Sequence, residues 1–203
     1  MVYISKVYTK FGDQGETMLA SGDTVPKDSP RVAAYGEVDE LNATIGLVRV
    51  ELARDPGASS EAGKQFATRV DATLARVQQE LFDLGAELAE PRATEGKARL
   101  KIYDEDIEAL EREIDQLNEK LEPLRSFVLP GGGPVGAAAH LARTVCRRAE
   151  RRAVALVHRH GQPVRGQAMR YLNRLSDLLF VVARAASHEL GHAEVLWDQS
   201  RKR

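Results

Sequence analysis

The sequence predicts an all-α protein: a five-helix bundle with left-handed, up-and-down packing, preceded by an extended N-terminal ligand-binding loop. Four segments repeat apolar residues at spacings of three and four, and their average of about 3.5 residues favours helices that pack at shallow angles. Capping residues, prolines and glycines lie between these segments, and the alternation typical of strands is nearly absent. We expect a single domain, with the loop at 1–28, the bundle at about 30–190 and a tail at 191–203.

The first two helices are expected to have clear ends. Ser29 can cap the first helix, Pro30 suits its first position, and the stretch 55–57 (Asp-Pro-Gly) closes it. Pro91 ends the second helix. The apolar faces are Val38, Leu41, Ile45, Val48 and Leu52 in the first helix, and Val70, Leu74, Val77, Leu81, Leu84 and Leu88 in the second.

The other three helices follow the same logic. Acidic residues at 104–106 suit the positive end of the third helix. Gly133 and Pro134 open the fourth, and Gly161 followed by Pro163 ends it. The apolar positions are Ile107, Leu110, Ile114, Leu117 and Leu121 in the third helix, Leu141, Val145 and Ala149 in the fourth, and Leu172, Leu175, Leu179 and Val182 in the last.

Composition excludes several classes of protein. The 29 lysines and arginines nearly cancel the 30 acids, so the overall charge predicts neither nucleic-acid nor membrane binding. The single cysteine, Cys146, allows no intrachain disulfide and is interpreted as a packing residue rather than a nucleophile. No apolar stretch approaches the ~20 residues that cross a membrane, and no signal-peptide core begins the chain, so we expect a cytoplasmic protein.

A run of ten residues that begins at Arg143 holds five arginines and one glutamate. At about 100° per residue, Arg143, Arg147 and Glu150 share one face of a helix, while Arg148 and Arg152 point elsewhere. The planar guanidinium group binds carboxylate or phosphate through two parallel hydrogen bonds. The shared face is therefore predicted to hold an anion, with a solvated charged face as the alternative interpretation.

Two glycine-containing stretches suit contact between backbone and ligand. Residues 8–17 place two glycines among hydroxyl and charged side chains, although a surface turn fits this pattern equally well. Residues 127–134 place three glycines before a helix, where N–H groups can meet an anion. A flexible joint is the more common use of such a stretch.

Polar residues in the first and last helices need partners. One sector of the last helix contains Asn173, Asp177, Phe180 and Arg184. Polar groups among leucines need hydrogen bonds, which the arginines of the preceding helix or a ligand would supply. Asp39 suits the start of the first helix, and it is equally a natural partner for one of the excess arginines.

Residues 188–192 match the His-Glu-x-x-His zinc pattern. A third ligand with suitable spacing does not follow, and Gly191 is expected to end the helix before the second histidine. We interpret the match as a helix terminus.

Six stretches, in this order, together resemble the PduO-type ATP:cob(I)alamin adenosyltransferases: residues 8–17, 25–28, 35–42, 127–132, 143–151 and 172–180. The resemblance extends from about Val7 to Trp197. It implies an enzyme that transfers the 5′-deoxyadenosyl group of ATP to cob(I)alamin, releases triphosphate and forms adenosylcobalamin. It also implies magnesium, a homotrimer with ATP bound between subunits, and a reductase that supplies electrons.

The resemblance also assigns roles to residues. Asp39 would pair with Arg143 across the subunit boundary, and Phe127 would lie beneath the corrin ring and displace its lower axial ligand. With Arg147, these residues are the ones expected to matter most for catalysis. The residues that would bind ATP are Thr9, Lys10, Gly12, Asp13, Gly15, Thr17 and Lys27 around the triphosphate and its magnesium, and Arg147, Glu150 and Asn173 on the bundle side.

Three positions depart from the family pattern. Phe11 stands where a threonine is usual, Thr24 where an arginine is common, and Glu37 where a threonine is frequent. The first two remove a hydroxyl group and a positive charge that would reach phosphate. The alternatives to the enzyme are an ATP-binding regulatory bundle without adenosyl transfer, and a nucleic-acid-binding helical protein that uses the arginine run.

Overall fold

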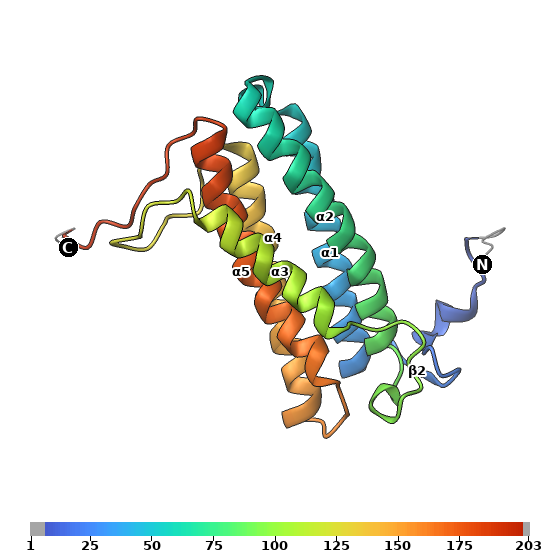
Figure 1. Cartoon of the computed structure of the whole chain (residues 1–203). Coiled ribbons are helices and arrows are strands. Elements are labelled where there is room, and N and C mark those ends of the chain that lie inside the picture. Colours follow the sequence, from blue (N-terminus) through green and yellow to red (C-terminus); the bar gives the residue numbers. More distant parts are fainter. Residues whose placement is uncertain (1–6, 201–203) are drawn as a thin grey trace.

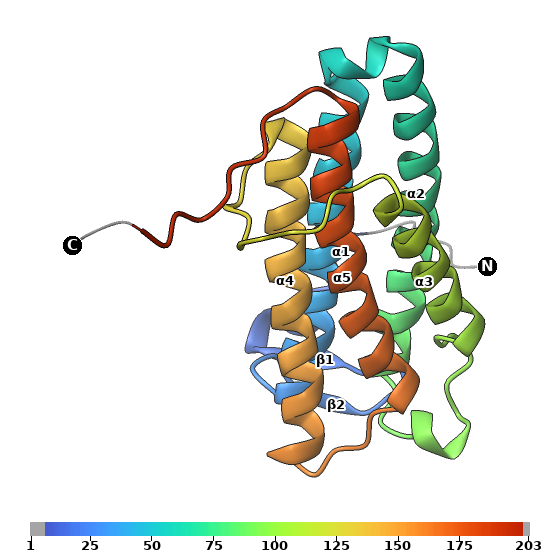
Figure 2. The same ribbon diagram turned by 60° about the vertical axis from the view of Figure 1, so that its left-hand side comes forward.

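Five helices form the protein in the computed structural model, which describes residues 7–200 (Figures 1 and 2). They are α1 (Pro30–Arg54), α2 (Glu61–Leu88), α3 (Asp104–Asn118), α4 (Gly133–His158) and α5 (Gly166–Glu189). Helix α4 packs against both α1 and α5, while α2 packs against α1 and α3 against α5. The predicted all-α bundle is confirmed, with four long helices and a shorter α3 of 15 residues.

The predicted helix starts are confirmed. The Ser29 hydroxyl accepts a hydrogen bond from the Val32 N–H, with Pro30 in the first turn of α1. Three acids occupy the first turn of α3, and the Asp106 carboxylate accepts from the Tyr103 N–H. Short 3₁₀ turns, η2 at 56–59 and η3 at 93–95, lie in the connections after α1 and α2.

Two predicted apolar positions are wrong. Leu141 is 49% exposed, because the buried line of α4 runs instead through small residues that allow close contact with α1 and α5. Leu121 lies beyond the end of α3 at Asn118 and is only partly buried. The buried residues of α4 are Val135, Gly136, Ala138, Ala139, His140, Ala142, Val145, Cys146, Ala149, Ala153 and Leu156.

Cys146 is a packing residue, as expected. It is fully buried, and its thiol donates a hydrogen bond to the Leu172 carbonyl at 3.2 Å. Burial raises the pKa of this thiol, so the reactive thiolate is disfavoured.

The N-terminal region contains a small hairpin, which the sequence pattern does not predict. Strands β1 (Glu16–Met18) and β2 (Thr24–Pro26) pair antiparallel, with Thr17 opposite Val25. A 3₁₀ turn, η1 (Phe11–Gln14), precedes them. Buried Leu19 and a hydrogen bond from the Ala20 N–H to the Ala89 carbonyl hold the hairpin at the end of α2.

The glycines before α4 form a packed joint rather than a flexible one. Gly132 and Gly133 both have positive φ, which favours glycine. A side chain on Gly132 would lie 2.0 Å from the Ser187 hydroxyl, and one on Gly133 would lie 2.3 Å from the His192 ring. The start of α4 is therefore locked against the end of α5.

Candidate active site

The run that begins at Arg143 contains arginines with partners and arginines without them. Arg148 pairs with Glu37 and Glu40 of α1, and Arg152 lies 3.7 Å from Glu37. Hydrogen bonds to these two carboxylates raise the pKa of Arg148 above its usual value. Glu37, one of the three departures from the family pattern, thus helps to hold α4 on α1.

Arg143 has no partner of this kind. Its Nε is buried, and within residues 7–200 the guanidinium group has no hydrogen bond or ion pair. Burial, and then the charge of Arg147, lowers the pKa of Arg143. A buried donor without an acceptor costs about 1–3 kcal/mol, so an acceptor beyond the described residues would stabilise Arg143.

Asp39 is the complementary group on α1. It is exposed, and the described part of the chain gives its carboxylate no hydrogen bond or ion pair. Asp39 lies about 200° from Glu37 and about 100° from Glu40 around the helix, which places it away from Arg148. An acid on α1 and an arginine on α4 thus both remain without a partner.

The structure brings together the predicted nucleotide contacts of the bundle. Arg147 is exposed on α4, and its guanidinium group also has no partner within the described residues. Glu150 lies one turn later and accepts a hydrogen bond from Asn173 Nδ2 of α5 at 3.1 Å. The site therefore offers a free cation for phosphate beside a carboxylate and an amide that can bind hydroxyl or base edges.

The remaining polar residues of the last helix differ from expectation. Asn173 and Asp177 are exposed, so the argument from their burial is wrong. Asp177 pairs with Arg174 of its own helix at 2.9 Å rather than with an arginine of α4. Arg184 is buried and pairs with Glu194 of the C-terminal segment at 3.0 Å.

The N-terminal loop is exposed and shaped by its glycines and one lysine. Lys27 Nζ donates to the Gly12 carbonyl at 2.9 Å, and a side chain on Gly12 would lie 2.7 Å from this nitrogen. Lys10 and Gly15, which flank η1, both have positive φ. Thr9 accepts weakly from the Phe11 N–H at 3.4 Å. Asp13 and Phe11 are exposed, and Thr17 lies in β1.

This loop and the arginine face are two separate halves of the predicted site. Between residues 9–28 and helices α4 or α5, the described chain has no hydrogen bond or ion pair. The loop is instead held at the end of α2, and Figure 1 shows it leading away from the bundle. Within one chain, residues 9–28 and the arginine face are therefore not joined by a hydrogen bond or ion pair between described residues.

Phe127 is 76% exposed and lies in the segment between α3 and α4. This segment and the C-terminal one extend together from the bundle (Figures 1 and 2). An aromatic ring with this exposure offers an apolar surface to a flat partner.

The His-Glu-x-x-His match is a helix terminus, as interpreted. Helix α5 ends at Glu189, and Gly191 turns the chain with a φ of +77°. His192 Nε2 then lies 2.8 Å from Asp55 at the end of α1. Glu189 pairs with Lys120, so these groups hold elements together.

His140 of α4 is a titratable group that the sequence analysis missed. It is 3% exposed, its Nδ1 has no hydrogen-bond partner among the described residues, and its ring meets Phe180 edge-on at 6.0 Å. Burial, and then the charge of Arg143, lowers the pKa of His140, while Glu194 opposes this shift. His140 therefore stays neutral at pH values where an unfolded histidine gains a proton.

We expect the protein to lose stability as the pH falls below about 6.5, in part through His140. The unfolded state takes up this proton first, so each pH unit down to the lowered pKa costs at most about 1.4 kcal/mol. His140→Gln removes the proton uptake. Urea unfolding should show that the free energy of unfolding falls less between mildly alkaline and mildly acidic pH in the variant than in the wild type. An equal fall in both proteins would contradict the contribution of His140.

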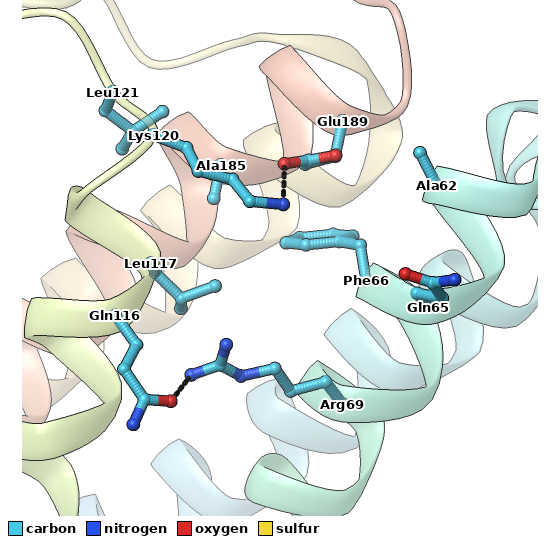
Figure 3. A pocket seen from close by; sticks show the side chains of 10 residues that line it. All are labelled: Ala62, Gln65, Phe66, Arg69, Gln116, Leu117, Lys120, Leu121, Ala185 and Glu189. Atoms are coloured by element: carbon cyan, nitrogen blue, oxygen red, sulfur yellow. Dashed lines mark hydrogen bonds and ion pairs between the residues drawn. The ribbon is translucent and has the colours of Figure 1, made fainter.

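A cavity of about 190 Å³ lies apart from these residues, between α2, α3 and α5 (Figure 3). Its two cations already have partners. Lys120 Nζ lies 3.1 Å from Glu189, and Arg69 pairs with Glu113 and donates to Gln116. The described residues that line this cavity leave no free cation for a phosphate, so we place no substrate there.

Comparison with known proteins gives a consistent result. The family model described as cobalamin adenosyltransferase matches residues 7–186. A corrinoid adenosyltransferase of Bacillus subtilis is 42% identical over 195 residues, which are 96% of this chain and 93% of that protein. A mouse corrinoid adenosyltransferase is 41% identical, over 97% of this chain and 78% of the mouse protein.

Solved structures agree. A variant of the PduO-type ATP:corrinoid adenosyltransferase from Lactobacillus reuteri, complexed with cobalamin and ATP, superimposes with a TM-score of 0.82. It is 34% identical in sequence, and the match covers 97% of this chain and 98% of that one. Another variant of the same enzyme, complexed with ATP, has a TM-score of 0.79 and 33% identity over 95% of this chain and 100% of that one.

Proposed function

Because the chain belongs to the cobalamin adenosyltransferase family, we propose that it transfers the 5′-deoxyadenosyl group of ATP to cob(I)alamin at a site shared by two subunits. The observation that carries this proposal is the division of the arginine run. Arg148 and Arg152 have carboxylate partners, whereas within the described residues Arg143, Arg147 and Arg151 have none. Of these three, Arg151 donates to the Arg147 carbonyl, and Arg143 and Arg147 lie on the predicted anion-binding face.

The reaction is a displacement at C5′ of ATP. The electron pair of cobalt(I) forms the cobalt–carbon bond, the C5′–oxygen bond breaks, and its electron pair leaves with the triphosphate. Cobalt passes formally from +1 to +3. Such a nucleophile needs no general base, so the task of the protein is to align the reactants and to neutralise the leaving group.

The arginine face and the N-terminal loop each contribute to aligning the reactants and neutralising the triphosphate. Arg147, with Glu150 and Asn173, holds the nucleotide from the bundle side. The N-terminal loop of a neighbouring subunit covers the triphosphate, with Lys27 as its cation. Lys27 Nζ donates a hydrogen bond to the Gly12 carbonyl, so the lysine already lies over the loop backbone before ATP binds. The loop residues Thr9, Lys10, Gly12, Asp13, Gly15 and Thr17 complete the contacts.

Magnesium enters with ATP in this proposal. The described residues contain no cluster of three or more His, Cys, Asp or Glu side chains that would hold a metal ion. A magnesium ion bound through phosphates needs only one or two carboxylates, and exposed Asp13 of the loop would supply one. When bound, the ion would neutralise charge on the triphosphate.

A homotrimer would give Arg143 an acceptor that residues 7–200 of its own chain do not supply. The Arg143 guanidinium group and the Asp39 carboxylate carry opposite charge, and neither has a partner in the described part of the chain. Their pairing across a subunit boundary satisfies both groups and fixes α4 of one subunit against α1 of another. This contact would order the ATP site.

We expect Asp39→Asn to lower turnover about tenfold and to weaken the trimer, because the pair with Arg143 loses its charge. Glu40→Gln is the matched control, since Glu40 lies on the same helix and has its partner, Arg148, in its own chain. Steady-state kinetics and sedimentation measure the two effects. Wild-type behaviour of Asp39→Asn would argue against an intersubunit pair.

The activity itself is tested by mixing the protein with ATP and chemically reduced cobalamin under strict anaerobiosis. Formation of a light-sensitive cobalt–carbon bond and of triphosphate is the expected result. ATP binding without this product would favour the regulatory bundle, which family membership disfavours. An affinity for oligonucleotides that falls steeply with salt would support the nucleic-acid alternative.

Two further expectations complete the proposal. A separate reductase supplies the electron that makes cobalt(I), and the reaction takes place in the cytoplasm. Among the described helices, none is long and apolar enough to span a membrane.

A further inference from the structure

The segment that carries Phe127 has a partner at the C-terminus. Residues Glu194–Trp197, which we call the C-terminal strap, pair with it antiparallel through a bridge between Val128 and Leu196. The Leu129 N–H donates to the Val195 carbonyl at 2.8 Å, and the Trp197 N–H donates to the Phe127 carbonyl at 2.7 Å. The two segments run side by side away from the bundle in both views (Figures 1 and 2).

Trp197 contacts the Phe127 side chain itself. The ring centroids lie 6.2 Å apart with an interplanar angle of 43°, a tilted aromatic contact. The Ser126 hydroxyl donates to the Trp197 carbonyl at 2.8 Å, so the backbones on both sides of this contact are held together. Trp197 is the single tryptophan of the chain, and it directly follows Val195 and Leu196. It restricts Phe127 on one side and leaves the rest of the ring exposed.

Arg184 fastens both segments to the bundle. This α5 side chain is only 8% exposed. Its Nε donates to Glu194 at the start of the strap at 3.0 Å, and its Nη2 donates to the Glu122 carbonyl in the Phe127 segment at 2.9 Å. This single guanidinium group therefore holds the start of the strap and the start of the Phe127 segment against α5. A buried charge with these partners is costly to release.

We propose that the C-terminal strap positions Phe127 against the corrin ring, with Trp197 holding the phenylalanine ring and Arg184 clamping the strap to α5. The inference rests on the proposed role of Phe127. Trp197 and Arg184 are positioning residues, since they act through Phe127. A ring that must exclude an axial ligand works only if it stays in place, and a displacement of about 1 Å can cost as much as about 100-fold in rate.

The test replaces Trp197 by alanine in the full-length protein, with ATP bound. The expected result is a smaller fraction of cob(II)alamin without its lower axial ligand, measured by electron paramagnetic resonance, and a kcat about tenfold lower. The Kd for ATP stays unchanged, because the nucleotide contacts lie on α4, α5 and the loop. Trp197→Phe restores both signals. Ser200→Ala is the control, because among the described residues the hydrogen bonds of this tail residue go to Asp198 alone.

Glu194→Gln provides a second, independent variant. It loosens the clamp at Arg184 and leaves both aromatic rings present, so the same spectroscopic signal should fall. A wild-type spectrum and kcat in both variants would overturn the positioning role while leaving the proposed function intact. An equal loss of ATP affinity and thermal stability in Trp197→Ala, without rescue by phenylalanine, would also overturn it. Absence of adenosyl transfer by the wild-type protein would instead refute the proposed function.

Discussion

Replacing Arg147 by alanine will lower kcat/KM for ATP by about 100- to 1000-fold, the cost of losing one preorganised donor to a developing negative charge. Arg147 is exposed, and its guanidinium group has no partner within residues 7–200. Its removal therefore breaks no contact of the folded chain. The circular dichroism spectrum and the melting temperature should stay those of the wild type, and steady-state kinetics with varied ATP should report the loss.

Arg152→Ala is the matched control for this variant. This variant also removes one arginine side chain from α4. Arg152, however, points toward Glu37 at 3.7 Å rather than onto the predicted anion-binding face. An exposed ion pair of this kind contributes about 0–1 kcal/mol, so neither stability nor turnover should change greatly. Equal kinetic losses in the two variants would mean that the site lies elsewhere on α4.

Replacing Phe127 by alanine is the second change with a large expected effect. Reduction to cobalt(I) is uphill while an axial ligand remains bound, and the exposed ring is the apolar group available to displace that ligand. We expect turnover to fall by about 100-fold when cob(II)alamin and a reductant are supplied, the scale on which misplaced reactive groups lose rate. The Kd for ATP should remain that of the wild type.

Phe82→Ala serves as its control, because Phe82 is a similarly exposed phenylalanine (67%) on α2. The key comparison uses cobalamin that is already fully reduced. Phe127→Ala should recover part of its activity under that condition, since the step that the ring assists has been bypassed. No recovery would indicate that Phe127 acts after reduction, and undiminished turnover with cob(II)alamin would remove its role.

The sequence alone predicted the helices because their signals are local. The spacing of Leu41, Ile45 and Val48 predicts one face of a helix, and Ser29 followed by Pro30 predicts where that helix starts. Leu141 broke this rule because α4 contacts two helices, and its buried line is set by how closely they approach. The distance between these helices cannot be predicted from the spacing of apolar residues along one segment.

Strands of three residues are also too short for the alternation of apolar and polar residues to predict them. The hairpin formed by β1 and β2 offers too few alternating positions, so the region was predicted as loop alone. The same holds for the bridge between Val128 and Leu196, whose partners are far apart in sequence. Trp197 was a usable signal, because a tryptophan is a large apolar side chain that usually packs against another group.

The site was predicted in part. Helical geometry separated Arg143 and Arg147 from Arg148, but only the fold shows that Arg148 is occupied by Glu37 and Glu40. The roles of Asp39 and of the N-terminal loop came from resemblance to a family, and they stay predictions. The structure adds a reason for them: among the described residues of one chain, no hydrogen bond or ion pair joins residues 9–28 to the arginine face.

The central claim is that each active site combines the N-terminal loop of one subunit with the arginine face of another. Subunit complementation tests it most directly. Arg147→Ala lacks the face and Lys27→Ala lacks the loop cation, so each homotrimer should have little activity. Co-assembled in equal amounts, the two chains should regain about a quarter of wild-type turnover, because random mixing gives that share of sites two intact halves. If both halves came from the same subunit, every site would keep a lesion, and the mixed trimers would stay as inactive as their parents.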